Sequence, residues 1–271
     1  MKLAKPLVLL GCMLGAAWSA PALADVDATI TYGKLSYTLT DLDPSDGIAP
    51  SLSFIPLSSD GYSGTLGASY SEWYRGHPAV SDYLNRSDFE GGPLSLDYVR
   101  GDSTMHASLG SRGAAPSQVL TIEDHLRTTD RTLNAYHSIF SDPVAFTLSA
   151  NTSVTFHTAM DYSAHVSGPG SSFLARSVLE VFIDPAGEDG HTVNAEGVSG
   201  IGDGTTLLQA SFSNGTSASA EGYALLSLFT SAAVVSPVPQ PAHGAMLLAG
   251  LAVLGLVRRR PTAPGRPSVR D

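Results

Sequence analysis

The chain of 271 residues carries 25 acidic and 15 basic side chains, a net charge of −10. An acidic surface repels phosphate backbones, so nucleic acid is excluded as an expected partner. The hydrophobic fraction of 43% is too high for a disordered chain. A charged fraction of only 15%, with 27 glycines and 17 prolines, favours short strands joined by turns over a helical bundle.

Residues 1–24 are predicted to be a secretory signal peptide, because they show a positive start, an apolar stretch and a small-x-small cleavage site. These parts are formed in turn by Lys2 and Lys5, by Leu7 to Trp18, and by Ala22, Leu23 and Ala24 just before Asp25. The alternatives are an N-terminal membrane helix and a lipoprotein signal at Cys12. Since Cys12 is the single cysteine, no disulfide or thiolate metal site is expected in the rest of the chain.

Residues 25–235 are expected to form one all-β domain, an antiparallel β-sandwich or jelly-roll-like fold with long loops. Apolar and polar side chains alternate with a period of two in several runs, and one run is apolar on nearly both faces, as in a central strand. The alternating runs lie at 35–40, 146–149 and 154–162, the apolar run at 178–183, and a closing strand at 224–229. Gly-, Pro- and Asp-rich turns separate them.

Two segments, 78–86 and 122–131, are ambiguous, because each could also form a short helix. A third segment, Gly200 to Gly204, contains half of a dinucleotide-binding fingerprint. That motif requires a helix after its glycines, whereas residues 205–212 have the pattern of a strand. We therefore expect a hairpin turn at 200–204.

Three aspartates beside Gly47, Asp41, Asp43 and Asp46, are the candidate calcium ligands, and calcium is the one cofactor considered. Their spacing does not fit an EF-hand loop, since Ser45 takes the place of the third acidic ligand and no closing glutamate follows. The alternative is a turn in which the aspartate side chains accept hydrogen bonds from backbone amides.

An aromatic and polar cluster, Tyr70, Glu72, Trp73 and Tyr74, is the candidate carbohydrate contact. Aromatic faces stack on sugar rings, and a neighbouring carboxylate binds sugar hydroxyls. In a regular strand Tyr70, Glu72 and Tyr74 would share one face. The alternative is that Trp73 belongs to the core.

The sequence has no Gly-x-Ser-x-Gly elbow and no His-x-x-x-His pair, so no catalytic residue is assigned. A Ser-His-Asp triad assembled from distant segments and a pair of carboxylates across a cleft remain open alternatives. A secreted β-fold hydrolase acting on polysaccharide or esters is therefore kept as a rival interpretation.

Residues 236–271 form a three-part tail: a Pro-rich linker at 236–243, an apolar run at 244–257 and a basic end at 258–271. As a helix the 14-residue run would span about 21 Å, short of the roughly 30 Å hydrocarbon core. The prolines before it and the arginines after it favour a segment held briefly in the membrane over a helix of the folded core. The residues that mark this order are Val238, Pro239, Gln240, Pro241, Arg258, Arg259 and Arg260.

This order resembles the PEP-CTERM sorting signal of exported proteins in Gram-negative bacteria. The resemblance implies processing of the tail by an exosortase-type protease, export through the inner membrane, and a final place at the cell envelope or outside the cell. It also implies a host that makes exopolysaccharide. Gln240 stands where the family usually has glutamate, and residues 261–271 extend beyond the usual end.

The sequence thus predicts an exported, sorted and non-enzymatic protein associated with exopolysaccharide or the biofilm matrix. Its membrane contact is expected only through the tail before processing. Besides the hydrolase, a purely structural adhesin module is the remaining alternative.

Overall fold

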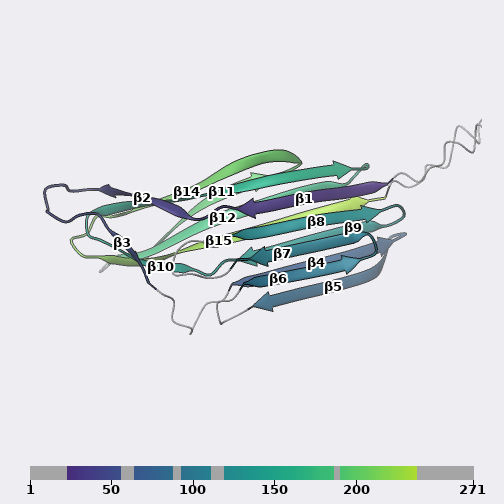
Figure 1. Cartoon of the computed structure of the whole chain (residues 1–271), viewed down its shortest axis with the longest axis horizontal. Helices are drawn as coiled ribbons and strands as arrows, with labels where there is room; N and C mark the ends of the chain where they lie inside the picture. The colour runs from purple at the N-terminus through teal and green to yellow at the C-terminus, as the bar shows by residue number, and fades with distance from the viewer. Residues whose placement is uncertain (1–22, 56–63, 88–92, 111–118, 186–189, 237–271) are drawn as a thin grey trace, which may run out of the picture. The chain divides into compact units, whose positions relative to one another are not determined.

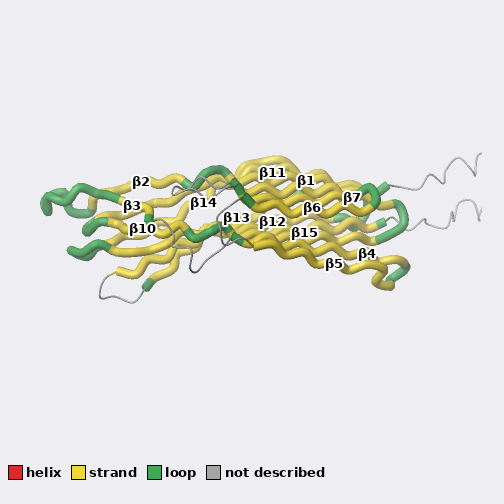
Figure 2. Tube along the Cα trace, turned by 60° about the horizontal axis from the view of Figure 1, so that its bottom comes forward, coloured by secondary structure: helices red, strands yellow, loops and turns green. Residues whose placement is uncertain are grey.

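The computed structural model describes residues 23–55, 64–87, 93–110, 119–185 and 190–236. In these ranges all regular structure is β-strand, and the paired strands run antiparallel, which confirms the all-β prediction (Figure 2). The predicted signal peptide up to residue 22 and the sorting tail from residue 237 lie outside the described residues. Within the described ranges, no helix has the length and apolar character that a membrane crossing requires.

Seven strands form sheet A, in the order β14-β11-β1-β8-β7-β6, with β2 also paired to β11 (Figure 1). The strands are β1 (Ala24–Tyr32), β2 (Ser36–Asp41), β6 (Leu94–Arg100), β7 (Ser103–Leu109), β8 (Leu120–Thr128), β11 (Thr152–Ser167) and β14 (Gly202–Asn214). Cleavage between Ala24 and Asp25, which stays a prediction, would remove only the first residue of β1.

Eight strands form sheet B, in the order β13-β12-β15-β9-β4-β5, with β10 paired to β15 and to β3. The strands are β3 (Leu52–Phe54), β4 (Thr65–Tyr74), β5 (His77–Ser87), β9 (Thr132–Phe140), β10 (Val144–Leu148), β12 (Ser172–Pro185), β13 (His191–Ser199) and β15 (Ala220–Val235). The apolar run 178–183 lies in β12 between two partner strands, as its pattern predicted.

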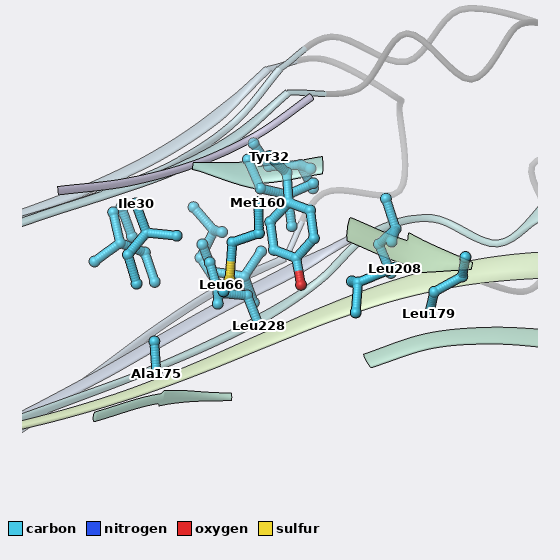
Figure 3. Close-up of a cluster of buried hydrophobic side chains, with 14 of the residues drawn as sticks. Ile30, Tyr32, Leu66, Met160, Ala175, Leu179, Leu208 and Leu228 are labelled. Carbon is cyan, nitrogen blue, oxygen red and sulfur yellow. The ribbon is translucent and has the colours of Figure 1, made fainter. Parts of the chain in front are cut away.

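One hydrophobic core lies between the two sheets. Every second side chain of β1 is buried, so Ile30 and Tyr32 point from sheet A toward Leu66 and Leu228 of sheet B (Figure 3). Each large apolar side chain buried in this way contributes roughly 1.5–3 kcal/mol. The alternating sequence pattern therefore selects both the strand and the face it buries.

Both ambiguous segments are strands: 78–86 lies in β5, and 122–128 lies in β8. On the edge strand β5 two inward side chains are charged and have partners on β6 of the other sheet. Tyr98 Oη donates to Asp82 Oδ2 at 2.6 Å, and Arg86 Nη1 donates to the Ser95 carbonyl at 2.9 Å. Inward charges on an edge strand also discourage pairing with another chain.

The glycine-rich segment predicted as a turn does connect two strands, with residues 200–201 between β13 and β14. The expected hairpin is corrected in one respect, since β13 belongs to sheet B and β14 to sheet A. Gly202 has a φ of 116°, a conformation that favours glycine. The turn therefore carries the chain from one sheet to the other.

Both ends of the described domain lie beside the turn between β8 and β9. Ala24 pairs with Thr128, and Ser236 donates from its backbone N–H to the Arg131 carbonyl at 3.0 Å. The short strands β2, β3 and β10 gather at the opposite end (Figure 1). The terminal strands β1 and β15 are each flanked by partners on both sides.

Candidate functional site

The structure separates the four residues predicted to contact carbohydrate into two pairs. Tyr70 and Glu72 point into the domain and are only 3% and 4% exposed, whereas Trp73 and Tyr74 are 41% and 40% exposed. The pairing of β4 with β5 shifts register between Glu72 and Trp73 because Ala79 of β5 has no opposite residue, whereas the pairing of β4 with β9 stays regular through Trp73. Trp73 lies on the outward side of β4 and is not a core residue, and Tyr74 is exposed at the end of the strand.

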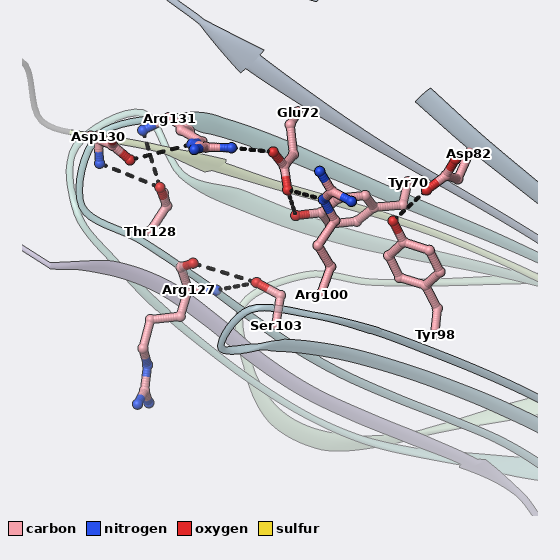
Figure 4. Close-up of polar contacts among 10 residues, drawn as sticks. All are labelled: Tyr70, Glu72, Asp82, Tyr98, Arg100, Ser103, Arg127, Thr128, Asp130 and Arg131. Atoms are coloured by element: carbon pink, nitrogen blue, oxygen red, sulfur yellow. Dashed lines mark hydrogen bonds and ion pairs between the residues drawn. The ribbon is translucent and has the colours of Figure 1, made fainter. Parts of the chain in front are cut away.

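Glu72 is the centre of a polar cluster that joins the two sheets at the end where the chain enters and leaves (Figure 4). Its Oε1 accepts hydrogen bonds from Arg100 Nε at 2.7 Å and from Tyr70 Oη at 3.1 Å, and its Oε2 accepts one from Arg131 Nη1 at 2.5 Å. Arg100 ends β6, and Arg131 lies in the turn between β8 and β9. In Figure 4 both guanidinium groups point at Glu72, while that of Arg127 points away.

These contacts decide the protonation of the cluster. Burial raises the pKa of Glu72, but the hydrogen bonds from Arg100 and Arg131 outweigh it and lower the pKa below its ordinary value. Burial and the charge of Glu72 raise the pKa of Tyr70. Burial and the hydrogen bond to Asp82 raise the pKa of Tyr98 to about 12. At neutral pH Glu72 is thus a fixed anion, and the tyrosines are hydrogen-bond donors.

A hollow of about 490 Å³ opens beside this cluster. A guanidinium has five N–H donors, so Arg100 and Arg131 keep donors beyond those that bind Glu72. Asp102 and Asp130 add acceptors to the wall. The lining residues are Leu23, Tyr70, Glu72, Arg100, Gly101, Asp102, Ser103, Arg127, Thr128, Thr129, Asp130, Arg131 and Leu133. Such a mixture of donors and acceptors suits a ligand rich in hydroxyl groups.

The exposed pair Trp73 and Tyr74 leads into the turn between β4 and β5. Arg75 and Gly76 both have positive φ, 51° and 80°, as a tight hairpin turn requires. The Arg75 guanidinium carbon lies 5.1 Å from the centre of the Tyr74 ring, a cation–π contact that orients this ring. Trp73 follows Glu72 directly, so its side chain points to the opposite side of the strand, onto the outer face of sheet B, and neither Trp73 nor Tyr74 lines the hollow.

The three aspartates of the candidate calcium loop accept hydrogen bonds from nearby backbone amides. Asp41 Oδ1 accepts from the N–H of Asp43, Asp43 Oδ1 from that of Ser45, and Asp46 Oδ1 from that of Ile48. Asp46 Oδ2 accepts from Asn151 Nδ2 at 2.7 Å. These contacts match the alternative interpretation, in which the aspartates stabilise turns.

Three histidine–aspartate pairs lie on the outer face of sheet A: His106 with Asp97 at 2.6 Å, His165 with Asp203 at 3.6 Å, and His125 with Asp27. Across the described ranges, however, no three His, Cys, Asp or Glu side chains are grouped so that they could hold a metal ion. Neither these pairs nor the Asp41 loop therefore gives support to a metal centre.

Sequence reasoning missed Arg100 and Arg131, the residues that give Glu72 its charge state. They lie 28 and 59 residues from Glu72 along the chain. Each sits at a turn marked by aspartate or glycine, Arg100-Gly101-Asp102 and Asp130-Arg131. The turns are visible in the sequence, but which turns meet at one end of the domain is set by strand order.

Comparison of the chain with known families, curated proteins and solved structures finds no matching family model, no matching protein and no matching structure.

Proposed function

We propose that the chain is an exported protein whose tail is processed by an exosortase-type protease, and that it holds exopolysaccharide at the cell envelope or outside the cell. The order of signal peptide, all-β domain and Val238-Pro239-Gln240-Pro241 tail supports this route. We also infer that the two facing sheets constitute a β-sandwich, a fold that presents ligand sites on its faces and at its ends.

The observation that carries the proposed binding function is the position of Trp73 and Tyr74. Both rings are exposed, and they follow Glu72 along β4, which lines a hollow together with Arg100 and Arg131 and their spare N–H donors. A sugar ring needs an apolar surface for its C–H groups and donors and acceptors for its hydroxyls, and small-molecule sites combine the two in this way. The end of the domain offers both.

The chemistry of Glu72 favours binding over catalysis. A general acid that cleaves a glycosidic bond needs a raised pKa, so that it holds a proton at working pH. The two arginines lower the pKa of Glu72 and occupy both of its oxygens. The carboxylate is therefore placed to orient the arginines, which in turn contact the ligand.

Affinity electrophoresis of the full chain in gels that contain the host exopolysaccharide tests the binding site. Trp73→Ala with Tyr74→Ala should weaken the affinity obtained from the retardation at least about tenfold, which corresponds to about 1.4 kcal/mol. Leu207→Ala, which removes a 64% exposed side chain from sheet A, is the matched control. Retardation that survives the double substitution would place the binding elsewhere.

Two measurements on the same material test the rest of the proposal. Mass spectrometry of the native protein should show a C-terminus before Arg258, and a chain intact to Asp271 would contradict processing. Incubation with the polysaccharide should release no oligosaccharide, and released product would show that the protein is a hydrolase.

A further inference from the structure

The outer face of sheet B is uncharged over four neighbouring strands. On residues 65–73 of β4, 81–87 of β5, 132–140 of β9 and 227–235 of β15, none of the described side chains that point away from the core is charged. Serine, threonine and asparagine alternate there with aromatic rings. The rings are Trp73, Tyr83, Tyr136, Phe140 and Phe229, and we call this surface the aromatic face.

The strand registers align the aromatic face into a transverse row. Tyr83 pairs with Ser69, Ser69 with Tyr136, and Tyr136 with Ser231, so a ring alternates with a hydroxyl across the sheet. Tyr83 is 69% exposed and Tyr136 42%. Strands are about 4.8 Å apart, which places positions two strands apart about 9.6 Å from each other. The row thus offers two stacking surfaces, with one serine hydroxyl between them and another beside the second.

The rings are supported by the sheet beneath them. A side chain at Gly67 would place its Cβ 2.6 Å from Ser138 Oγ and 3.6 Å from the Tyr83 hydroxyl, so Tyr83 leans over a position that only glycine leaves open. Phe140 and Phe229 meet edge to face, with ring centres 5.3 Å apart. Ordered aromatic side chains lose little conformational entropy when a ligand stacks on them.

The charge of the surroundings selects the ligand. Two charged side chains lie next to the face. Arg176 is opposite Phe229 and is already paired with Glu196 at 2.5 Å. Arg75 is in the turn after Trp73, over the Tyr74 ring. The face offers no cation to a carboxylate or sulfate, and the acidic chain repels anionic polymers. An uncharged, hydroxyl-rich polymer needs no cation and is not repelled by the acidic chain.

We infer that the aromatic face binds an uncharged polysaccharide in an extended conformation, with sugar rings stacked on Tyr83 and Tyr136 and hydroxyls bound by the serines between them. This inference rests on the proposed function, since it names the class of polysaccharide and extends the site from Trp73, itself part of the aromatic face, along the outer side of sheet B. A chain laid across β5, β4, β9 and β15 follows the row of alternating rings and hydroxyls.

Affinity electrophoresis of the full chain in gels of hydroxyethyl cellulose, which is neutral, and of alginate, which is anionic, tests the inference. The wild-type chain should be retarded by hydroxyethyl cellulose and not by alginate. Tyr83→Ala with Tyr136→Ala should weaken binding to the neutral polymer at least about tenfold. Val99→Ala, which changes a 71% exposed side chain on sheet A, should leave it unchanged, and Tyr83→Phe should retain most of it.

Three results would overturn the inference, and they differ from failure of the proposed function. Retardation in alginate alone would reject the neutral ligand. Equal retardation of the wild type and the double variant in hydroxyethyl cellulose would reject the aromatic face. In both cases the host exopolysaccharide could still bind. A dimer in light scattering that Tyr83→Ala with Tyr136→Ala converts to monomer, without retardation by hydroxyethyl cellulose, would show that the face joins two copies of the chain. A wild-type chain that binds no polysaccharide, host material included, would reject the proposed function as well.

Discussion

Replacing His137 with leucine is expected to destabilise the two-sheet domain by about 3–5 kcal/mol, because it leaves a buried carboxylate without its partner. His137 on β9 and Asp124 on β8 are both fully buried, and His137 Nε2 lies 2.7 Å from Asp124 Oδ1. Since β9 belongs to sheet B and β8 to sheet A, this contact crosses the core.

Only one polar atom of each residue in the pair has a hydrogen-bond partner, and this determines the result expected when both residues are replaced. His137 Nδ1 and Asp124 Oδ2 are buried and find no hydrogen-bond partner among the described residues. Each such atom costs roughly 1–3 kcal/mol. Asp124→Val alone should cost about 1–3 kcal/mol, since the ring then loses its one partner. His137→Leu with Asp124→Val removes all four polar atoms and should leave stability within about 2 kcal/mol of the wild type, or above it.

Urea unfolding at pH 7, followed by far-ultraviolet circular dichroism, gives the free energy of each variant and the coupling energy of the cycle. The double variant should be more stable than His137→Leu. If instead the costs of the two single substitutions add up in the double variant, the two side chains do not depend on each other and the reasoning fails. An unchanged slope with urea checks that unfolding remains two-state.

Three further perturbations have definite expected outcomes. The pKa of Glu72 is lower in the folded protein than its ordinary value of 4.5, so its ionised form stabilises the fold above pH 4.5, and this stability is lost as the pH falls through the lower folded pKa. In Glu72→Gln the melting temperature should therefore change less with pH in this acid range. Gly222→Ala should cost about 1–3 kcal/mol in thermal unfolding, because its Cβ would collide with the backbone carbonyl oxygen of Phe182, whereas Gly215→Ala meets nothing within 4 Å and should be neutral. Phe156→Ala should cost about 3–5 kcal/mol in urea unfolding, since this ring is fully buried; a loss below 1 kcal/mol would mean that the core is looser than described.

The all-β class and several strands could be predicted because their signal is local. In β11 the residues 154, 156 and 160 are buried and their neighbours are not, as the period of two requires. The segments in β5 and β8 were ambiguous because polar groups occupy inward positions. Asp82 and Arg86 on β5 and Asp124 on β8 interrupt the alternation, and each finds its partner on the opposite sheet. The local sequence pattern does not show which residue lies opposite across the core.

The candidate site was predictable only in part for the same reason. Tyr70, Glu72, Trp73 and Tyr74 lie within residues 70–74, so the sequence shows them as one cluster, but the burial of Glu72 depends on arginines from distant turns. The aromatic face is even harder to predict from the sequence. Its five rings are spread over four strands, and only the registers between the strands bring them onto one face, with Tyr83 and Tyr136 in one row.

The position of β15 has a mechanical consequence. The strand ends at Val235, and it lies between β12 and β9, to which it is hydrogen-bonded along most of its length. A pull applied through Ser236 along the strand must shear these two ladders together instead of peeling one edge bond at a time. The domain is thereby suited to hold its shape under drag when it is fastened from that end.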